Sequence, residues 1–484
     1  MPIVHPGDTL AGAPSSAGRA PGSTGIAHGS AGISGSRDMR QHRRNIGNPV
    51  RHGARTALAR SGRGRALRSL LIGALVTFGI CSQVGGANRA ATASFPRLMG
   101  MNIGAKNYED AAYQRDISRL DVVLLGFYRG WLPPGYAANS TLAMRKAVRA
   151  IKARNPGILV GQYTVLNEAY DNPNDAATAD LREKLTANKW WLLNAAGRKV
   201  QWTTDYSAWE TNFTTWTRPD AGDRRWPQWL AERNYAVFFR DIPEFDIVYF
   251  DNVMANSRVR GDWNLAGRDA DPADPGIVAA HRAGHLEHWN HMRKLMPGAL
   301  LIGNTDNDLA NEQWRDQLNG GFLEGLMGER WSIEKREGWN AMMERYRAVL
   351  QYTRQPKIVG FNVSGAVDDY RFFRYAYTSC LLDDGYFSFT DTSRGFSSVA
   401  WFDEYEYKLG NALSAPPNAA WDEGIWRRDF QNGVVLVNPT TGTRTVNVEP
   451  GLRRLAGKQD PGVNNGSAVG QLTLRPKDGI VLRR

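Results

Sequence analysis

From about residue 96 onward, short apolar segments alternate eight times with stretches of helical periodicity, and this alternation restricts the chain to few folds. Most of the apolar segments are nearly continuous runs, which is typical of parallel strands covered on both faces. The predicted strands are Leu98–Ile103, Asp121–Phe127, Ile158–Thr164, Asp246–Asp251, Ala299–Gly303, Gly321–Leu326, Lys357–Val363 and Gly385–Phe389. Eight strands alternating with helices predict an α/β fold, a (β/α)₈ or TIM barrel.

Helical segments lie between these strands. Thr141–Ala153 repeats apolar residues at helical spacing and ends before a Pro-Gly stop, as does Ile277–Met296, and Trp339–Tyr352 is a third helix. A doubly wound open sheet is the alternative architecture, but no Gly-x-Gly-x-x-Gly turn follows the first strand. We therefore expect the barrel, at residues 94–415, and no cofactor.

After Pro416-Pro417 the sequence pattern changes and is typical of a separate small domain. It reads as five short antiparallel strands: Ile425–Phe430, Gly433–Asn438, Arg444–Val448, Gln471–Arg475 and Ile480–Arg483. Asn432-Gly433 and Asp478-Gly479 are hairpin turn signals placed between them. Residues 416–484 are thus predicted to form a sandwich-like β domain that packs on the barrel.

The basic charge of the chain belongs to its first residues. Residues 1–93 hold twelve Arg, no Lys and two Asp, so they contribute +10 to the net charge of +12. Residues 94–484 carry only the remaining +2. A protein that binds the phosphate backbone needs its positive charge on the folded surface, so we expect no nucleic-acid partner.

The same leader, rich in Gly, Ala, Ser and Arg, is predicted to be disordered and to carry a targeting signal. Arg residues up to Arg68 precede the apolar run Ser69–Ile80, and Ala91-Thr92-Ala93 follows, which is the order of a signal peptide. Roughly twelve apolar residues are few for a membrane span, which needs about 20. A cleaved signal is favoured over an uncleaved anchor, which would be the chain's one membrane contact. We expect a secreted, periplasmic or cell-envelope protein of a bacterium.

Two predicted strands deliver a carboxylate to the same end of the barrel. Ile247-Val248-Tyr249-Phe250 runs into Asp251, and Phe322-Leu323 runs into Glu324, whose flanking Gly residues leave room for a ligand. The C-terminal ends of barrel strands carry function. Two acids at one mouth suit glycosidic bond cleavage, in which one protonates the leaving oxygen and the other attacks the anomeric carbon or activates water. A helix N-cap for Asp251 and a structural ion pair for Glu324 are the alternatives for each residue taken singly.

Other residues near the strand ends are amides, hydroxyls, acids and aromatic rings, which suit a neutral polyhydroxylated ligand. The candidate substrate-binding residues are Asn102, Tyr128, Tyr163, Asn252, Asn304, Asp306, Trp331, Asn362 and Asp391. Each of them could equally be a satisfied residue of the barrel rim.

The connection between the third and fourth strands, Val165–Phe245, is far longer than a compact βα connection. It holds seven of the 16 Trp residues: Trp190, Trp191, Trp202, Trp209, Trp216, Trp226 and Trp229. The rings either form a sugar-stacking wall above the barrel mouth or make up the core of the insertion itself. For a single Trp, the core interpretation is favoured because large aromatic side chains are mostly used for burial.

Two rival chemistries are weaker. His281, His285 and His288 share one face of a helix, so a metal is conceivable, but His-Glu-x-x-His is absent and the helix should lie outside the barrel. We expect no metal site and no Ser-His-Asp triad. Cys380, the lone Cys after the leader, lies in a segment that reads as a buried helix, so we expect a core residue and no disulfide.

Several short sequence segments of the chain resemble those of a known family. Val248-Tyr249-Phe250-Asp251-Asn252-Val253, the Trp190–Trp202 stretch, Phe322-Leu323-Glu324-Gly325 and Phe430–Pro439 are similar to hypothetical glycosyl hydrolase family 15. That family is related to the endo-α-1,4-polygalactosaminidase barrels. The resemblance covers roughly residues 96–484. It implies a glycoside hydrolase in which Asp251 is the nucleophile and Glu324 the acid/base.

The sequence therefore favours an exported hydrolase that cleaves a poly- or oligosaccharide with retention of configuration. One alternative is a non-catalytic glycan-binding protein of the cell envelope, which would keep the aromatic cleft without two carboxylates in catalytic reach. The other is a metal-dependent hydrolase or deacetylase that uses the histidine helix. The separation of the two carboxylates distinguishes the first alternative from the enzyme.

Overall fold

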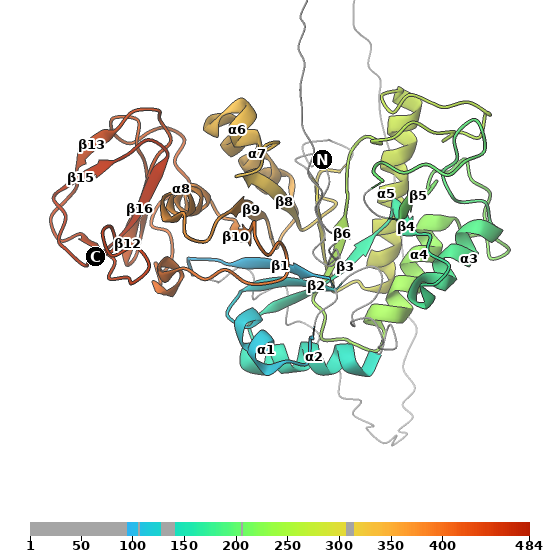
Figure 1. Cartoon of the computed structure of the whole chain (residues 1–484), viewed down its shortest axis with the longest axis horizontal. Coiled ribbons are helices and arrows are strands. Elements are labelled where there is room, and N and C mark those ends of the chain that lie inside the picture. Colours follow the sequence, from blue (N-terminus) through green and yellow to red (C-terminus); the bar gives the residue numbers. More distant parts are fainter. Residues whose placement is uncertain (1–93, 105–106, 127–140, 205–206, 306–313) are drawn as a thin grey trace, which may run out of the picture. The chain divides into compact units, whose positions relative to one another are not determined.

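The computed structural model describes residues 94–104, 107–126, 141–204, 207–305 and 314–484. Its main sheet holds eight parallel strands in the order β1-β2-β3-β6-β7-β8-β9-β10 (Figure 1). They are β1 (Met99–Ile103), β2 (Val122–Gly126), β3 (Leu159–Val165), β6 (Ile247–Asp251), β7 (Leu300–Gly303), β8 (Gly320–Met327), β9 (Gly360–Gly365) and β10 (Tyr386–Asp391). A parallel bridge between Leu98 and Phe387 nearly closes the sheet into a barrel. The predicted (β/α)₈ fold is confirmed.

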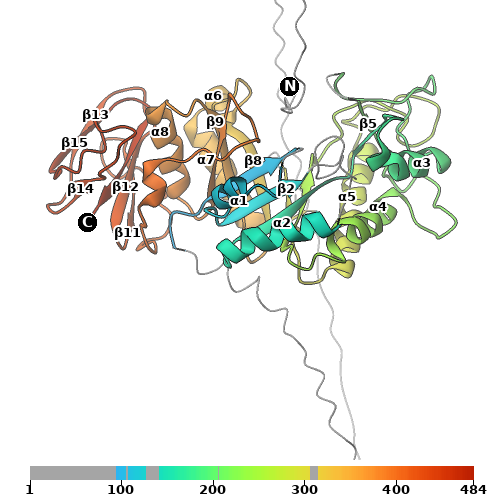
Figure 2. The ribbon, with the colours of Figure 1, turned by 60° about the horizontal axis from the view of Figure 1, so that its bottom comes forward.

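Helices lie between the strands along the chain, most of them in the barrel and two in the insertion after β3. They are α1 (Ala111–Ile117), α2 (Thr141–Arg154), α3 (Ala179–Ala187), α4 (Trp226–Asn234), α5 (Pro275–Leu295), α6 (Ile333–Glu337), α7 (Trp339–Tyr352) and α8 (Tyr370–Leu381). Figures 1 and 2 show α1 and α2 running alongside β1, β2 and β3. Helix α5 begins where Asp274 accepts hydrogen bonds from the amides of Gly276 and Ile277, with Pro275 in its first turn. Among the described residues, no helix is long and apolar enough to span a bilayer.

The apolar strands are buried on both faces because the barrel has two apolar layers. Alternate residues such as Ile247 and Tyr249 point into the barrel core, whereas Val248 and Phe250 belong to the larger cluster beneath the helices. This alternation has a period of two residues, so Asp251 follows Tyr249 on the inward side.

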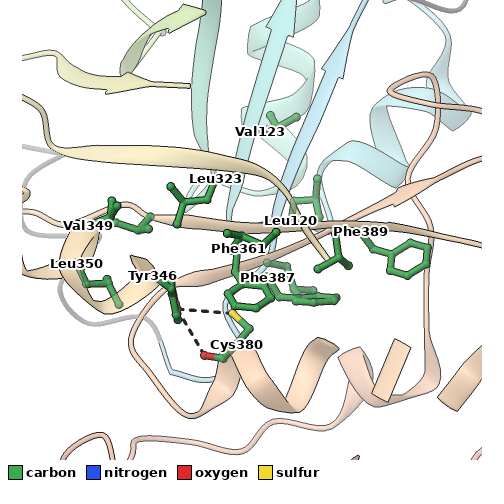
Figure 3. Packing of buried hydrophobic residues seen from close by; sticks show 14 of the residues in the cluster. Leu120, Val123, Leu323, Tyr346, Val349, Leu350, Phe361, Cys380, Phe387 and Phe389 are labelled. Carbon is green, nitrogen blue, oxygen red and sulfur yellow. Dashed lines mark hydrogen bonds between the residues drawn. The ribbon is translucent and has the colours of Figure 1, made fainter. Parts of the chain in front are cut away.

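Cys380 lies in the outer apolar layer. Figure 3 shows it on α8, facing Tyr346 of α7 and surrounded by the aromatic rings of Phe361 and Phe387. The Tyr346 hydroxyl lies 3.7 Å from the Cys380 sulfur and accepts a hydrogen bond from the amide of Gly385. Burial raises the pKa of the Cys380 thiol, so the residue packs as a core side chain.

The C-terminal strands form two small antiparallel sheets. They are β11 (Trp426–Phe430), β12 (Gly433–Asn438), β14 (Arg453–Arg454) and β16 (Asp478–Arg483) in one sheet, and β13 (Arg444–Asn447) and β15 (Gln471–Leu474) in the other. Residues of both sheets share one apolar cluster. The opposite face of β12 and β16 packs on α8 (Figure 1).

The two turn signals in this region are displaced from their predicted places. Phe430 pairs with Gly433, so the first turn is Gln431-Asn432 and Gly433 already belongs to β12. Asp478 and Gly479 belong to β16, and the turn before them includes Lys477, which has a positive φ of 51°. Strand β14 was not predicted, because two residues are too short for a recognisable pattern.

The insertion after β3 has a core of its own. It contains β4 (Glu168–Tyr170), β5 (Ala208–Glu210), α3, α4 and the π-helical turn Tyr235–Phe239. Trp190, Trp191 and Trp226 are buried together in one apolar cluster with leucine side chains of α3 and α4. For these three rings the core interpretation is correct, whereas Trp202 is only partly buried and lines a cavity described below.

Candidate active site

Asp251 and Glu324 lie close together because one amide bridges them. Asn304 follows β7, the strand between β6 and β8, and its Nδ2 donates to Asp251 Oδ1 at 3.1 Å and to Glu324 Oε2 at 2.8 Å. These two oxygens can be no farther apart than the sum of the two bond lengths, about 5.9 Å, which is near the ~5–5.5 Å of retaining carboxylates. The two candidate acids therefore share one small region of the barrel mouth.

Two tyrosines of the barrel core lie beneath the acids. Tyr163 of β3 donates its hydroxyl hydrogen to Asp251 Oδ2, so both oxygens of Asp251 accept hydrogen bonds. Burial raises the pKa of Tyr249 well above its usual value, and the neighbouring carboxylates of Asp251 and Glu324 add to this shift. Tyr249 is thus a neutral phenol, and it fills the space under the acids with an aromatic ring.

A cavity of about 390 Å³ opens beside Glu324. Its walls come from the insertion, from the segment after β6, from β8 and from α6 and α7. The residues that line it are Trp202, Asn252, Met254, Arg258, Asn304, Glu324, Gly325, Trp331, Ile333, Arg336 and Arg345. The wall thus combines aromatic rings, amides and guanidinium groups around a single carboxylate, a composition suited to a polar ligand with ring faces.

The sequence profile of hypothetical glycosyl hydrolase family 15 matches residues 112–434, more than half of the chain. The chain belongs to this family. The resemblance of its sequence segments to this family is therefore confirmed. The carbohydrate substrate that the family implies fits the mixed aromatic and polar wall of the cavity. No curated protein matches the chain in a sequence search.

Several solved glycoside hydrolases have a distant structural similarity to this chain. The glycoside hydrolase domain of PelA from Pseudomonas aeruginosa is 13% identical, with a TM-score of 0.40, and covers 63% of this chain and 98% of its own. An α-amylase from Lactobacillus plantarum is 11% identical, with a TM-score of 0.44, and covers 80% of this chain and 98% of its own. Amy13B from Eubacterium rectale is 10% identical, with a TM-score of 0.46, and covers 82% and 98%.

Several of the predicted substrate-binding residues lie together at this site. Asn252, Asn304 and Trp331 line the cavity, and Tyr163 contacts Asp251. Gly325 was expected to leave room for a ligand. A Cβ there would lie 2.3 Å from the Trp331 ring, so the glycine also lets this ring pack against the strand.

Three other predicted residues have different roles. Asn102 is one residue out of phase with the inward-facing Met101 and Ile103, so its side chain points outward and accepts from the Tyr113 hydroxyl of α1. Asn362 lies behind Glu324, where it accepts from the amide of Gly325 and donates to Thr390. Asp391 accepts from the amide and hydroxyl of Ser393 and so closes its own loop. Tyr128 and Asp306, which are also predicted to bind substrate, lie outside the described residues.

Sequence reasoning missed a set of charged residues near the cavity. Arg258 lines it, and Glu168 and Glu210 are buried behind it. Arg336 and Arg345, from α6 and α7, also line it, and both pair with Glu337. One signal was available: Glu168 interrupts a mostly apolar stretch at the start of the insertion, and a charged residue in such a stretch is rarely left without a partner.

The histidines of α5 are packed among aromatic rings, away from the acids. The ring centroid of His281 lies 4.8 Å from that of Phe213, and the ring centroid of His285 lies 5.5 Å from that of Trp314. Within the described part of the chain, no three His, Cys, Asp or Glu side chains are grouped as metal ligands would be. Burial lowers the pKa of His281 to about 3 and of His288 to about 4, and lowers that of His285 well below its usual value.

These buried histidines make folding sensitive to acid. Below about pH 6.5 the unfolded chain takes up protons that the folded chain does not, so the histidine contribution to stability is present above that pH and is lost as the pH falls. His285→Phe removes one such proton uptake. Between pH 6.5 and 4.5 the stability of the variant should fall less steeply than that of the wild type, by a difference that grows to about 1.4 kcal/mol per pH unit at the acid end of this range. Phe213→Leu, which disturbs the same packing without a titrating group, should keep the wild-type slope. Parallel slopes for His285→Phe and wild type in urea melts would contradict the assignment.

Proposed function

We propose that this chain hydrolyses glycosidic bonds with retention of anomeric configuration, with Asp251 as nucleophile and Glu324 as general acid and base. The observation that carries the proposal is the Asn304 amide, which donates to both carboxylates and limits the separation of their bonded oxygens to about 5.9 Å. Inverting enzymes need about 6.5–9.5 Å between their acids to admit a water molecule. A glycan-binding protein without activity has no need for two acids so close together.

The reaction proceeds in two displacements. In the first, an Asp251 oxygen attacks the anomeric carbon, the glycosidic C–O bond breaks, and the leaving oxygen takes the proton of Glu324. In the second, Glu324 removes a proton from water, the hydroxyl oxygen attacks the anomeric carbon, and the ester bond to Asp251 breaks. The products are a free reducing end and an alcohol, and both side chains return to their starting protonation states.

The surroundings of the acids support these two roles. Asp251 is 6% exposed and accepts from Tyr163 and Asn304, which fixes its orientation, as a nucleophile requires. Glu324 lines the open cavity, where a leaving group and then a water molecule can reach it. Trp202 and Trp331 place aromatic rings on the wall of the same cavity, where sugars can pack against them. The histidines, the basis of the metal-dependent alternative, belong to the packing under α5 instead.

We also propose that the protein acts outside the cytoplasm. The order of basic residues, an apolar run and small residues in the leader supports export. This segment falls within residues 1–93, outside the described residues. A poly- or oligosaccharide of the cell surroundings is accordingly the proposed substrate.

Purified protein should release reducing ends from at least one member of a panel of neutral, amino-sugar and uronic acid polysaccharides. Proton NMR in the first minutes of the reaction should show that the new reducing end has the anomeric configuration of the bond that was cleaved. A product of opposite configuration would contradict the two-step mechanism, and no cleavage across the panel would contradict the enzyme assignment. Glu404→Gln, which alters a buried acid bonded to Asn464 and distant from the cavity in sequence and contacts, serves as the folded control.

A further inference from the structure

The base of the insertion holds two buried acids directly opposite each other. Strands β4 and β5 pair antiparallel, and their register places Glu168 across from Glu210. Each side chain is only 3% exposed. Like charges at directly opposite positions destabilise a two-stranded sheet, and burial increases the cost of each charge. The two acids therefore need a positive group that compensates their charge, and their cost suggests that they have a function beyond packing.

Arg258, from the segment after β6, supplies the compensating charge. Its Nη2 donates to Glu168 Oε2 at 3.1 Å and its Nε donates to Glu210 Oε1 at 3.3 Å. One guanidinium balances one acid only. Burial raises the pKa of Glu168 to about 8, and the nearby carboxylates of Glu210 and Asp251 add to the shift, against the effect of Arg258. Burial raises the pKa of Glu210 as well, so a proton shared by the two acids brings the three side chains closer to neutral.

The same three side chains are bonded to the cavity wall. Arg258 Nη1 donates to Asn252 Oδ1 at 3.1 Å, and Asn252 Nδ2 donates to Glu168 Oε1 at 3.4 Å. Asn252 follows Asp251 directly and has a positive φ of 54°, a left-handed conformation that costs a non-glycine residue energy. The contacts on both ends of its amide hold this conformation in place, and with it the turn of the chain just after Asp251.

The set also fixes one aromatic ring of the cavity. The Trp202 indole N–H donates to Glu168 Oε2 at 3.2 Å, and the Arg258 guanidinium carbon lies 4.2 Å from the Trp202 ring centroid. The Nε, Nη1 and Nη2 contacts described above thus go to the insertion and to Asn252. A purely apolar core would hold the insertion in place at lower cost, but it could not orient an amide and an indole at the same time.

We propose that Glu168, Glu210 and Arg258 form a positioning unit, which holds Asn252 and Trp202 on the cavity wall and keeps Asp251 directed at Glu324. These are positioning residues, since they act through Asn252 and Trp202. The inference rests on the proposed function for the meaning of Asp251, but its structural content can be tested independently of any activity.

The test is the triple variant Glu168→Gln, Glu210→Gln, Arg258→Met, which removes the charges together and leaves no unpaired buried ion. We expect it to fold, with kcat on the polysaccharide cleaved by the wild type reduced about 10²-fold and KM changed much less, because a misdirected nucleophile slows the chemical step. Hydrogen exchange should speed up at the amides of Val253 and Met254, which bond to the carbonyls of Asn304 and Asn252. A matched control is Arg374→Met, Asp460→Asn, Asp478→Asn, another buried Arg between two acids, located where α8 meets the C-terminal strands.

The outcomes separate the two proposals. Wild-type kcat and wild-type protection at Val253 and Met254 in the folded triple variant would overturn the positioning unit. If the wild type cleaves nothing in the panel, the proposed function fails, and hydrogen exchange still decides the inference. If the triple variant does not fold, Glu210→Gln alone, which removes the negative charge from one partner of Arg258, should give the same two changes at smaller size, and their absence would overturn the inference.

Discussion

Glu324→Gln is expected to lower kcat on a natural polysaccharide by about 10²–10⁴-fold, because the amide can neither protonate the leaving oxygen nor activate water. Asp251→Asn should lower it at least as much, because the neutral amide cannot form the glycosyl ester. Both substitutions preserve side-chain size, so melting temperature and glycan binding should change little. Asp383→Asn, which alters a buried acid paired with Arg347, is the matched control and should keep wild-type kcat.

An activated substrate separates the two roles. With a dinitrophenyl glycoside of the sugar found in the panel, the leaving group departs without a proton. Glu324→Gln should then keep a fast first step and release a burst of dinitrophenol, while the glycosyl ester on Asp251 accumulates. Asp251→Asn should show no burst with the same substrate. A burst from Asp251→Asn and none from Glu324→Gln would mean that the roles are reversed, and equal full activity of both would exclude the pair.

The barrel fold and the nearness of Asp251 and Glu324 could be predicted from the sequence, because both depend on short-range patterns. Apolar runs such as Ile247–Phe250 identify buried parallel strands, and the polar residue that ends a run lies at the barrel mouth. Because side chains alternate between the two faces of a strand, the position of an end residue in this two-residue period decides whether it faces into the barrel. Asn102 follows the inward-facing Met101 by one position, so the same two-residue period would have excluded it from the cleft.

The positioning unit could not be predicted in the same way. Arg258 and Glu168 are 90 residues apart, and their contact depends on how the insertion folds back over the segment after β6. A repeating pattern of apolar residues cannot predict such a contact, because the insertion has its own core and only short, irregular strands. The glycines around Glu324 illustrate the same limit. A Cβ at Gly321 would clash with Thr305 and one at Gly325 with Trp331, so these glycines serve the packing of the strand, and Gly325 also lines the cavity.

Gly320 at the start of β8 shows how tightly the strand that carries Glu324 is packed. A Cβ at this position would lie 1.5 Å from the backbone carbonyl oxygen of Ile358, just before β9. Backbone atoms cannot move aside as a flexible side chain can. Gly320→Ala should therefore force β8 and β9 apart and destabilise the protein by more than about 4 kcal/mol, which is seen as loss of soluble protein or a large drop in melting temperature.

Gly298→Ala is the matched comparison, since a Cβ in that turn before β7 would have no neighbour within 4 Å. It should change stability by less than about 0.5 kcal/mol. If Gly320→Ala folds with near-wild-type stability, β8 tolerates a shift of its backbone at that point. Such a shift would also move Glu324, four residues farther along the same strand, so kcat of the folded variant would then fall. A stable Gly320→Ala protein with full activity would contradict both the tight approach of β8 to β9 and the placement of Glu324 that depends on it.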